Sequence, residues 1–396
     1  MKKRERKREG LPTERPNSWM KDLYAELATQ NRLKTLPDSF AKSLSSNDYL
    51  GLARHPKVLS ASIHAIRKFG AGASGSRFLS GNHLLNTDLE KAIAEFKTPG
   101  NGHGIVFSSG YHANLSIMNV LGDCSSVIYS DQENHASLID GLRSTKKPIF
   151  IYPHNDWEWV KDHLSANPSA RPLIVTESIF SMSGDIAPIK ELYLIAQCFN
   201  GIMVIDDAHG TGIIGENGRG VLEKHSLEFD PGHMILTGTF SKALGSLGGF
   251  AILGKKEKKV LLSCARPFIY TTALPPGVLG ASLEALNILS SNPSLVQNLQ
   301  DNSFFWNYAL ASKHSSIPII PIKGDLDTLK KRSETFSQMG LSLPVIKYPT
   351  VPKGKEQLRL SVNLNWDKSI YDALFGVFNI QTLADDKISQ KTNSSG

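Results

Sequence analysis

The sequence contains little cysteine and no long apolar run, and each of these shortages excludes a class of protein. Its 396 residues include three cysteines, Cys124, Cys198 and Cys264, which lie far apart and form no CxxC pair. We therefore expect neither a disulfide framework nor a metal site, and a reducing cytoplasmic location fits best. Since no stretch is long and uncharged enough to cross a bilayer, no membrane partner is expected either.

Positive charge is concentrated at the N-terminus. The formal net charge of +7 comes partly from the opening MKKRERKR, and the segment that follows has no apolar stretch, so we expect no secretory signal. A basic arm can contact nucleic acid or anionic lipid, but this one lacks interleaved aromatic residues. We interpret it as a solvated tail and expect no nucleic-acid partner, and we interpret the polar residues 386–396 in the same way.

The middle of the chain has the pattern of an α/β domain. Between residues 44 and 289, β-branched runs alternate with helix-like stretches, which is typical of a mostly parallel sheet with helices on both faces. The predicted strands are near-continuously apolar and span 104–107, 126–131, 173–178, 201–206, 234–239 and 249–253. We expect an N-terminal segment 1–43, a large domain 44–289, a smaller C-terminal α+β domain 290–385, and a tail.

Familiar nucleotide-binding and hydrolase motifs are missing or out of place. Residues 70–75, GAGASG, match GxGxxG, but they follow a helical pattern instead of a strand, which is the wrong context for a dinucleotide. The glycines are better explained by a tight backbone path beside a ligand or a subunit boundary. No GxSxG, HExxH or Walker A sequence occurs.

Two predicted strand ends carry side chains of chemical interest. The strand 201–206 places Asp206 at its carboxyl end, where ligands bind in α/β sheets, and His209 follows. A capping aspartate with a loop histidine explains this pair equally well, and a metal pair would lack further ligands nearby. Lys242 follows the strand 234–239, where a buried lysine is costly unless it is paired or covalently used, although an ordinary surface lysine is an alternative.

A third strand end offers an anion site. The turn Ser109–Gly110–Tyr111 leads from a strand into a predicted helix, so that free N–H groups and the helix dipole point at an anion, with a hydroxyl from Thr239. An N-capped helix without a ligand is the common alternative. In combination, a lysine, an acid and a phosphate-binding turn are the parts that a pyridoxal 5'-phosphate (PLP) enzyme requires.

These segments together resemble the α-oxoamine synthase family of PLP-dependent enzymes. The motifs SSNDYLG, SSGYHAN, NHASLIDG, TESIFSMSGD, DDAHGTG, TGTFSKALG and YTTALPP occur in the family's order between about Leu44 and Leu364. The resemblance implies the type I fold of PLP-dependent transferases, in which a large α/β domain holds the cofactor and a smaller α+β domain follows. It also implies a homodimer with shared active sites.

The resemblance assigns roles to individual residues. Lys242 would bind the cofactor covalently, and Asp206 would pair with the ring nitrogen and keep it cationic. His209 would bond the ring hydroxyl, Ser181 would lie near the cofactor, and His135 would stack on the ring. The catalytic residues implied in this way are Lys242, His135, Asp206 and His209.

Phosphate and substrate contacts are implied in the same way. The phosphate would be bound by Ser109, Gly110, Tyr111 and Thr239, and Thr271 or Thr272 would reach the phosphate of the neighbouring subunit. The implied substrate-binding residues are Asn47, Thr350, Arg359 and Arg32. An arginine such as Arg359 offers the planar two-pronged donor that matches a carboxylate, and Arg32 would bind the far carboxylate of a dicarboxylic acyl chain.

The motifs also favour one reaction within the family. DDAHGTG, YTTALPP and TVPKG are most similar to the branch that condenses L-alanine with a pimeloyl thioester of CoA or acyl carrier protein during biotin synthesis. A sister enzyme using glycine and acetyl-CoA, a long-chain acyl condensing enzyme, and an inactive PLP-binding regulator are the alternatives. The sequence departs from the family at Trp366, where a histidine is usual, and at Ser183, where an aspartate is usual; neither belongs to the implied cofactor set.

Overall fold

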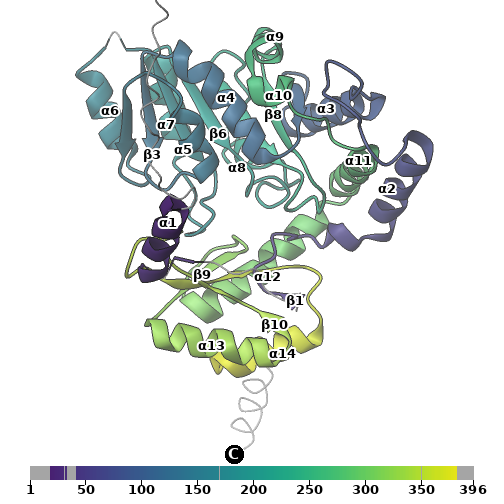
Figure 1. Cartoon of the computed structure of the whole chain (residues 1–396), viewed down its shortest axis with the longest axis vertical. Coiled ribbons are helices and arrows are strands. Elements are labelled where there is room, and N and C mark those ends of the chain that lie inside the picture. Colours follow the sequence, from purple (N-terminus) through teal and green to yellow (C-terminus); the bar gives the residue numbers. More distant parts are fainter. Residues whose placement is uncertain (1–17, 31, 34–41, 169, 349, 381–396) are drawn as a thin grey trace, which may run out of the picture.

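A seven-stranded sheet forms the centre of the larger part of the molecule (Figure 1). Its strand order is β2-β8-β7-β6-β5-β3-β4, and only β8 runs antiparallel to its neighbours. The strands are β2 (His103–Phe107), β3 (Val127–Asp131), β4 (Ile149–Tyr152), β5 (Pro172–Glu177), β6 (Ile202–Asp206), β7 (Met234–Thr239) and β8 (Gly249–Leu253). The predicted mostly parallel sheet is confirmed, and β4 is an edge strand that the sequence pattern did not reveal.

The computed structural model describes residues 18–30, 32–33, 42–168, 170–348 and 350–380. The basic residues 1–8 and the polar residues 386–396 lie outside the described residues. The three cysteines are free and exposed. Among the described residues, no helix combines the length and the apolar character that crossing a bilayer requires.

Helices cover both faces of the large sheet because successive strand residues point to opposite sides. On β5, Leu173 and Val175 pack into one apolar cluster, whereas Ile174 between them packs into the other. The first cluster includes residues of α4 (Gly110–Cys124), α5 (Ala136–Leu142), α9 (Lys255–Cys264) and α10 (Arg266–Ile269). The second includes residues of α3 (Leu84–Lys97), α6 (Trp157–Ser165), α7 (Ile189–Cys198), α8 (Val221–Lys224) and α11 (Pro276–Ser291).

The C-terminal part forms a smaller α+β unit below the large sheet in Figure 1. Its three-stranded antiparallel sheet has the order β11-β12-β9. The elements are α12 (Ser294–Ala311), β9 (Ile319–Lys323), α13 (Leu326–Gln338), β10 (Leu341–Ser342), β11 (Val345–Ile346), β12 (Gln357–Ser361) and α14 (Lys368–Phe378). The short β1 (Lys42–Ser43) pairs with β10, so the chain enters the larger part by way of the smaller one.

The N-terminal helices lead to the glycine-rich segment. They are α1 (Ser18–Thr29), the 3₁₀ turn η1 (Leu52–Arg54) and α2 (Pro56–Phe69). Gly70 ends α2 with a φ of +92°, so the GAGASG segment follows a helix, as expected, and does not continue from a strand. The carbonyl of Gly75 accepts a hydrogen bond from the amide of Ala273 at 3.0 Å, which places this loop beside the predicted threonines of 271–272.

Candidate active site

A continuous chain of hydrogen bonds begins at Lys242, just after β7. Its Nζ lies 2.8 Å from Nε2 of His209, and Nδ1 of His209 lies 2.9 Å from the hydroxyl of Tyr49. Tyr49 donates to Oδ1 of Asn47 at 3.0 Å, and Nη1 of Arg359 donates to the same oxygen at 3.1 Å. The fold therefore joins the predicted residues Lys242, His209, Asn47 and Arg359 between the large sheet and β12.

The protonation of this chain follows from its contacts. Burial, with the charges of Lys242 and Arg359 nearby, lowers the pKa of His209 well below its ordinary value, so the ring is neutral. Because Tyr49 donates to Asn47, its oxygen accepts a hydrogen bond from Nδ1–H of His209. Nε2 is then free to accept a hydrogen bond from Lys242, which fixes the orientation of the lysine amine.

Lys242 is more acidic than an ordinary lysine. Burial lowers its pKa to about 8, against the opposing effect of the nearby carboxylates of Asp206 and Glu177. A lysine with this pKa has a substantial fraction of unprotonated amine near neutral pH, and that form attacks carbonyl groups.

Asp206 ends β6 with a carboxylate fixed on both oxygens. Oδ2 accepts a hydrogen bond from the side-chain amide of Asn114 at 2.7 Å, and Oδ1 accepts one from the main-chain N–H of Ala208 at 3.0 Å. Asn114, on α4, is itself fixed because its Oδ1 accepts from the hydroxyl of Thr237 at 2.6 Å. The acid is therefore held in one orientation before any ligand binds.

His135 is joined to this acid through two polar side chains. Its Nδ1 lies 2.7 Å from the hydroxyl of Ser137 and accepts the main-chain N–H of the same residue at 3.2 Å, which caps α5. The hydroxyl of Ser137 in turn accepts from Asn114 at 2.9 Å. Burial lowers the pKa of His135, so its imidazole is neutral and its free edge is available to a ligand.

Glu177, at the end of β5, is a buried carboxyl group beside Asp206. The two residues are opposite each other in the parallel ladder, and Glu177 is 3% exposed. Burial, together with the charge of Asp206, raises the pKa of Glu177 well above its ordinary value. Its Oε1 has no hydrogen-bond partner among the described residues, so a buried polar atom is left for a ligand.

The predicted phosphate-binding turn is formed at the start of α4. Gly110 approaches Thr239 so closely that a Cβ at position 110 would lie 3.3 Å from the Cβ of Thr239. The hydroxyl of Ser109 accepts the N–H of His112 at 3.1 Å and so caps the helix. The N–H groups of Gly110 and Tyr111, in the first helical turn, have no intrahelical acceptor. The Ser109 cap therefore leaves the N–H groups of Gly110 and Tyr111 available, so capping of the helix and binding of an anion are compatible.

Four predicted residues lie outside this cluster in the single chain. Among the described residues, the side chains of Thr271, Thr272, Thr350 and Arg32 form no hydrogen bond with it. The guanidinium of Arg32 lies 5.8 Å from the centre of the Tyr348 ring, near Thr350 in sequence. Within a single chain, the contacts of these four residues therefore give no support for a role in the site.

Among the described residues, the side chains of the two departures from the family pattern, Ser183 and Trp366, form no hydrogen bond with the cluster, although Ser183 lies in the same loop as Ser181. Ser181 contributes its carbonyl, which accepts from Nε of Arg359 at 2.6 Å. The hydroxyl of Ser183 accepts a main-chain N–H within the same loop at 3.4 Å. Trp366 packs edge-on against Trp306 within the smaller part, with ring centres 6.1 Å apart. We therefore expect both to act on neighbouring packing instead of on the chemistry.

The residues of the cluster that the sequence analysis did not single out include Tyr49, Asn114 and Glu177. Tyr49 and Asn114 are polar residues inside the motifs SSNDYLG and SSGYHAN, and Glu177 is the last residue of an apolar strand. For Asn114 and Glu177, a polar residue inside a buried helix face or at the end of a buried strand was the available signal, whereas Tyr49 lies between elements and has no such signal.

The arrangement fits PLP. Lys242 supplies an amine with a pKa of about 8, Asp206 supplies an oriented carboxylate, and the start of α4 supplies N–H groups suited to a phosphate. Glu177 leaves a buried oxygen atom without a partner. Among the described residues, no group of three or more His, Cys, Asp or Glu side chains is placed to hold a metal ion.

Comparisons with known proteins agree on the type of enzyme. The model of the aminotransferase class I and II family matches residues 42–365. The 8-amino-7-oxononanoate synthase of Thermoanaerobacter pseudethanolicus is 38% identical over 346 residues, which cover 85% of this chain and 86% of that protein. A serine palmitoyltransferase variant from S. paucimobilis with bound PLP and myriocin is 27% identical, with a TM-score of 0.82 and coverage of 92% and 98%. The 8-amino-7-oxononanoate synthase of Francisella tularensis is 26% identical, with a TM-score of 0.72 and coverage of 86% and 98%.

Proposed function

Since the chain belongs to the aminotransferase class I and II family, we propose that it condenses L-alanine with a pimeloyl thioester to give 8-amino-7-oxononanoate, CO2 and a free thiol. Its fold is that of the type I PLP-dependent transferases, and its cofactor is PLP. The choice of acyl substrate is supported by the relative from Thermoanaerobacter pseudethanolicus that is named for this product, since it is 38% identical, whereas the serine palmitoyltransferase neighbour is 27% identical.

The observation that carries this proposal is that Arg359 is buried without an anionic partner. Arg359 is 5% exposed, and no carboxylate among the described residues forms an ion pair with it. A buried cation without a counter-ion is costly, so a substrate carboxylate would complete the site. The hydrogen bonds to Asn47 and to the carbonyl of Ser181 already hold the guanidinium in place.

The chain's residues have distinct tasks in such a reaction. When bound, PLP supplies an electron-withdrawing ring that stabilises negative charge at the amino acid Cα. Asp206 would pair with the ring nitrogen, and the N–H groups of Gly110 and Tyr111, with the hydroxyl of Thr239, would bind the phosphate. His135 would lie against the ring and donate a hydrogen bond to the thioester oxygen as charge develops there.

Proton transfer is assigned to Lys242. As a free amine, Nζ of Lys242 would be the base that removes the Cα proton, and burial lowers its pKa to about 8 in the chain itself, which suits this task near neutral pH. Nε2 of His209, 2.8 Å away, keeps this amine oriented, and the neutral ring adds no positive charge beside it. Arg359 and Asn47 would bind the amino acid carboxylate that later leaves as CO2.

A homodimer is part of this proposal. On α2, Leu59, Ile63 and Ile66 are 48%, 50% and 41% exposed and fall on one helix face, and Leu79 and Tyr270 are 83% and 71% exposed. A second copy of the chain would cover these side chains.

In such a dimer, Thr271 and Thr272 would reach the partner's phosphate. Light scattering should give twice the chain mass, and Thr271→Ala/Thr272→Ala should weaken PLP binding without changing that mass.

The substrate assignment is tested by offering amino acids and acyl thioesters in combination. Thiol release and aminoketone formation are measured with L-alanine, glycine or L-serine against pimeloyl-CoA, pimeloyl carrier protein, acetyl-CoA and palmitoyl-CoA, with Lys242→Ala as the control. The best turnover with L-alanine and a pimeloyl thioester supports the proposal. A preference for glycine with acetyl-CoA, or for serine with palmitoyl-CoA, the pair suggested by the serine palmitoyltransferase neighbour, replaces it with a sister reaction. Bound PLP without any turnover indicates a regulatory protein.

A further inference from the structure

The loop of residues 178–187, here called the bridging loop, follows β5 of the large sheet and contacts the smaller part of the molecule. Its Ser181 carbonyl accepts from Nε of Arg359 at 2.6 Å, and its Met182 carbonyl accepts from the side chain of Gln357 at 2.8 Å. Gly184 has a φ of +70°, and a Cβ there would lie 2.6 Å from the carbonyl oxygen of Ile319. The bridging loop is thus pressed against β9 and β12, and its main chain sets the position of the Arg359 guanidinium.

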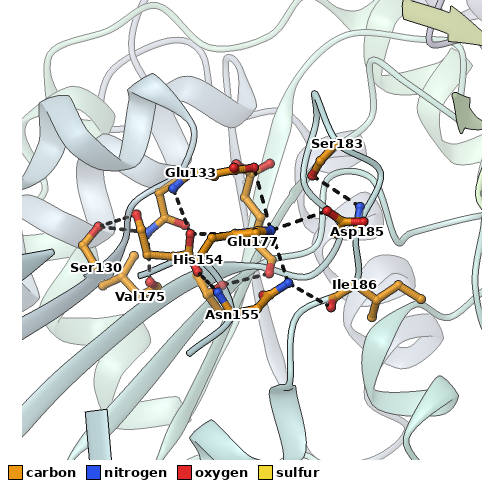
Figure 2. A network of polar contacts seen from close by, with 12 residues as sticks. Ser130, Glu133, His154, Asn155, Val175, Glu177, Ser183, Asp185 and Ile186 are labelled. Atoms are coloured by element: carbon orange, nitrogen blue, oxygen red, sulfur yellow. Dashed lines mark hydrogen bonds and ion pairs between the residues drawn. The ribbon is translucent and has the colours of Figure 1, made fainter. Parts of the chain in front are cut away.

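A histidine on the opposite side holds the same loop (Figure 2). His154 follows β4, and its Nε2 lies 3.6 Å from Oδ2 of Asp185 in the bridging loop. Its Nδ1 lies 3.1 Å from Oδ1 of Asp131 at the end of β3, and Nε2 also lies 3.7 Å from Oε2 of Glu133. The imidazole edge packs against the ring of Phe180, another residue of the bridging loop, with ring centres 4.3 Å apart.

Three carboxylates lie around His154 and favour its charged form. The side-chain amide of Asn155 also lies 3.2 Å from Nε2, and a charged imidazole would donate to the oxygen of that amide, which has no other partner among the described residues. Burial by itself lowers the pKa of His154, but the contacts with Asp131, Asp185 and Glu133 outweigh it and raise the pKa to about 10. Asp131 is 1% exposed, so its partner is fixed in a site of low dielectric, where a charge-assisted contact is strong. The contact with His154 in turn lowers the pKa of Asp185, against the effect of burial.

Two contacts link His154 to the proposed substrate site: His154 contacts Asp185, and the carbonyl of Ser181 in the same loop contacts Arg359. Asp185 and Ser181 belong to one compact loop, since the N–H of Phe180 donates to the carbonyl of Asp185 at 3.0 Å and the N–H of Gly184 donates to the carbonyl of Phe180 at 2.9 Å. We therefore expect a shift of Asp185 to displace the carbonyl of Ser181. The side chain of Asp185 also has an ion-pair partner in the smaller part, but this pair is weak, because Lys313 lies 3.8 Å from Asp185 and is 49% exposed.

We propose that His154 is a positioning residue: as a cation it holds Asp185 and the bridging loop, so that the carbonyl of Ser181 keeps Arg359 in place for the amino acid carboxylate. This inference rests on the proposed role of Arg359. It predicts that the histidine acts on amino acid binding from a distance, without touching the substrate, the cofactor or the reacting atoms.

The test compares two histidines on the same side of the sheet. His154→Gln removes the positive charge from the contact with Asp185. His163→Gln is the matched control, because His163 is also packed among aromatic rings and lies 2.8 Å from the hydroxyl of Tyr129, yet it has no contact with the bridging loop. Asp185→Asn breaks the same link from the loop side, where the side chain is 44% exposed, and keeps the test available if His154→Gln does not fold.

Three measurements are made on each variant. Hydrogen exchange is followed in residues 178–187 of the cofactor-free protein. The Kd of the preferred amino acid is obtained from the absorbance change of the bound cofactor, and KM and kcat are measured for that amino acid. In His154→Gln and Asp185→Asn we expect faster exchange in the bridging loop and a rise of about tenfold or more in Kd and KM, with a smaller change in kcat. His163→Gln should leave all three unchanged.

The outcomes separate this inference from the proposed function. If His154→Gln and Asp185→Asn leave loop exchange, Kd and KM at wild-type values, or lower kcat alone, the inference is overturned even if wild-type turnover is as proposed. If the wild type turns over no acyl thioester, the proposed function fails, while exchange and amino acid titration still decide whether His154 positions the loop.

Discussion

The hydroxyl of Tyr49 lies 2.9 Å from Nδ1 of His209, although 160 residues separate them in the sequence. Tyr49 belongs to the segment that follows β1, and His209 follows β6 at the centre of the large sheet. The contact joins the lysine side of the site to Asn47 and Arg359, so the orientation of the Lys242 amine depends on a tyrosine that is completely buried.

Tyr49→Phe should weaken both activity and folding. The change removes the acceptor of the His209 Nδ1–H and one donor to Asn47, and an unmatched buried polar group costs about 1–3 kcal/mol. We expect kcat/KM for the amino acid to fall by about tenfold or more. Tyr129→Phe is the control. The hydroxyl of Tyr129 also lies 2.8 Å from a histidine Nδ1, but its strand, β3, is separated by β5 and β6 from β7, which precedes Lys242. Equal losses of kcat/KM in both variants would contradict the assigned role of Tyr49.

The pKa of Lys242 should be visible in cofactor attachment. The neutral amine is the reactive form, so the rate at which cofactor-free protein takes up PLP should rise with pH and level off above about pH 8, following the lowered pKa of this lysine. An ordinary lysine would level off near its usual pKa of about 10.4. Absorbance gives the rate, and Lys242→Ala should show no covalent uptake. A rate that still climbs steeply between pH 9 and 10 would show that burial does not lower this pKa.

The ion pair of Lys97 with Asp207 should matter for stability. Both side chains are almost fully buried, at 1% and 0% exposure, and Lys97 also donates to the hydroxyl of Thr211 at 3.0 Å. Asp207→Asn leaves a buried cation without its partner, so we expect the free energy of unfolding to fall by about 3 kcal/mol.

Denaturant unfolding of the cofactor-free protein measures this loss. The control is Lys42→Met, which removes the exposed pair with Asp367, where the side chains are 59% and 50% exposed. Surface pairs contribute at most about 1 kcal/mol. If Asp207→Asn costs no more than Lys42→Met, the buried pair is not a structural requirement.

The charge of His154 predicts a pH dependence of stability. Its pKa is raised in the folded protein from 6.5 to about 10, since Asp131, Asp185 and Glu133 together outweigh the effect of burial. The stabilisation is therefore fully present below about pH 6.5 and is lost as pH rises toward 10. Across this window the free energy of unfolding of the wild type should fall relative to that of His154→Gln. Parallel pH curves for the two proteins would show that His154 is not protonated in this range.

The sequence by itself determined the large sheet and most of the site. Continuous apolar runs predicted β2, β3, β5, β6, β7 and β8, because strands covered on both faces have few polar positions. Asp206 is the last residue of one such run and Lys242 follows another by three residues, so their place at one edge of the sheet followed from the chain's local pattern. The strand β4 was not predicted, although its residues Ile149–Tyr152 (IFIY) also form a short apolar run. Only the structure shows that it lies at the sheet edge, where Ile149 and Ile151 are 36% and 57% exposed.

The tertiary structure alone decided which residues meet across the two parts of the molecule. Tyr49 and Arg359 reach the same asparagine oxygen only because β12 folds back over the segment after β1, and no local pattern encodes a contact between residues 310 positions apart. The link from His154 to the bridging loop has the same origin. Hydrophobic periodicity sets the strands and helices, whereas the hydrogen bonds that orient a buried cation or a lysine amine depend on distances fixed by the packing of distant elements.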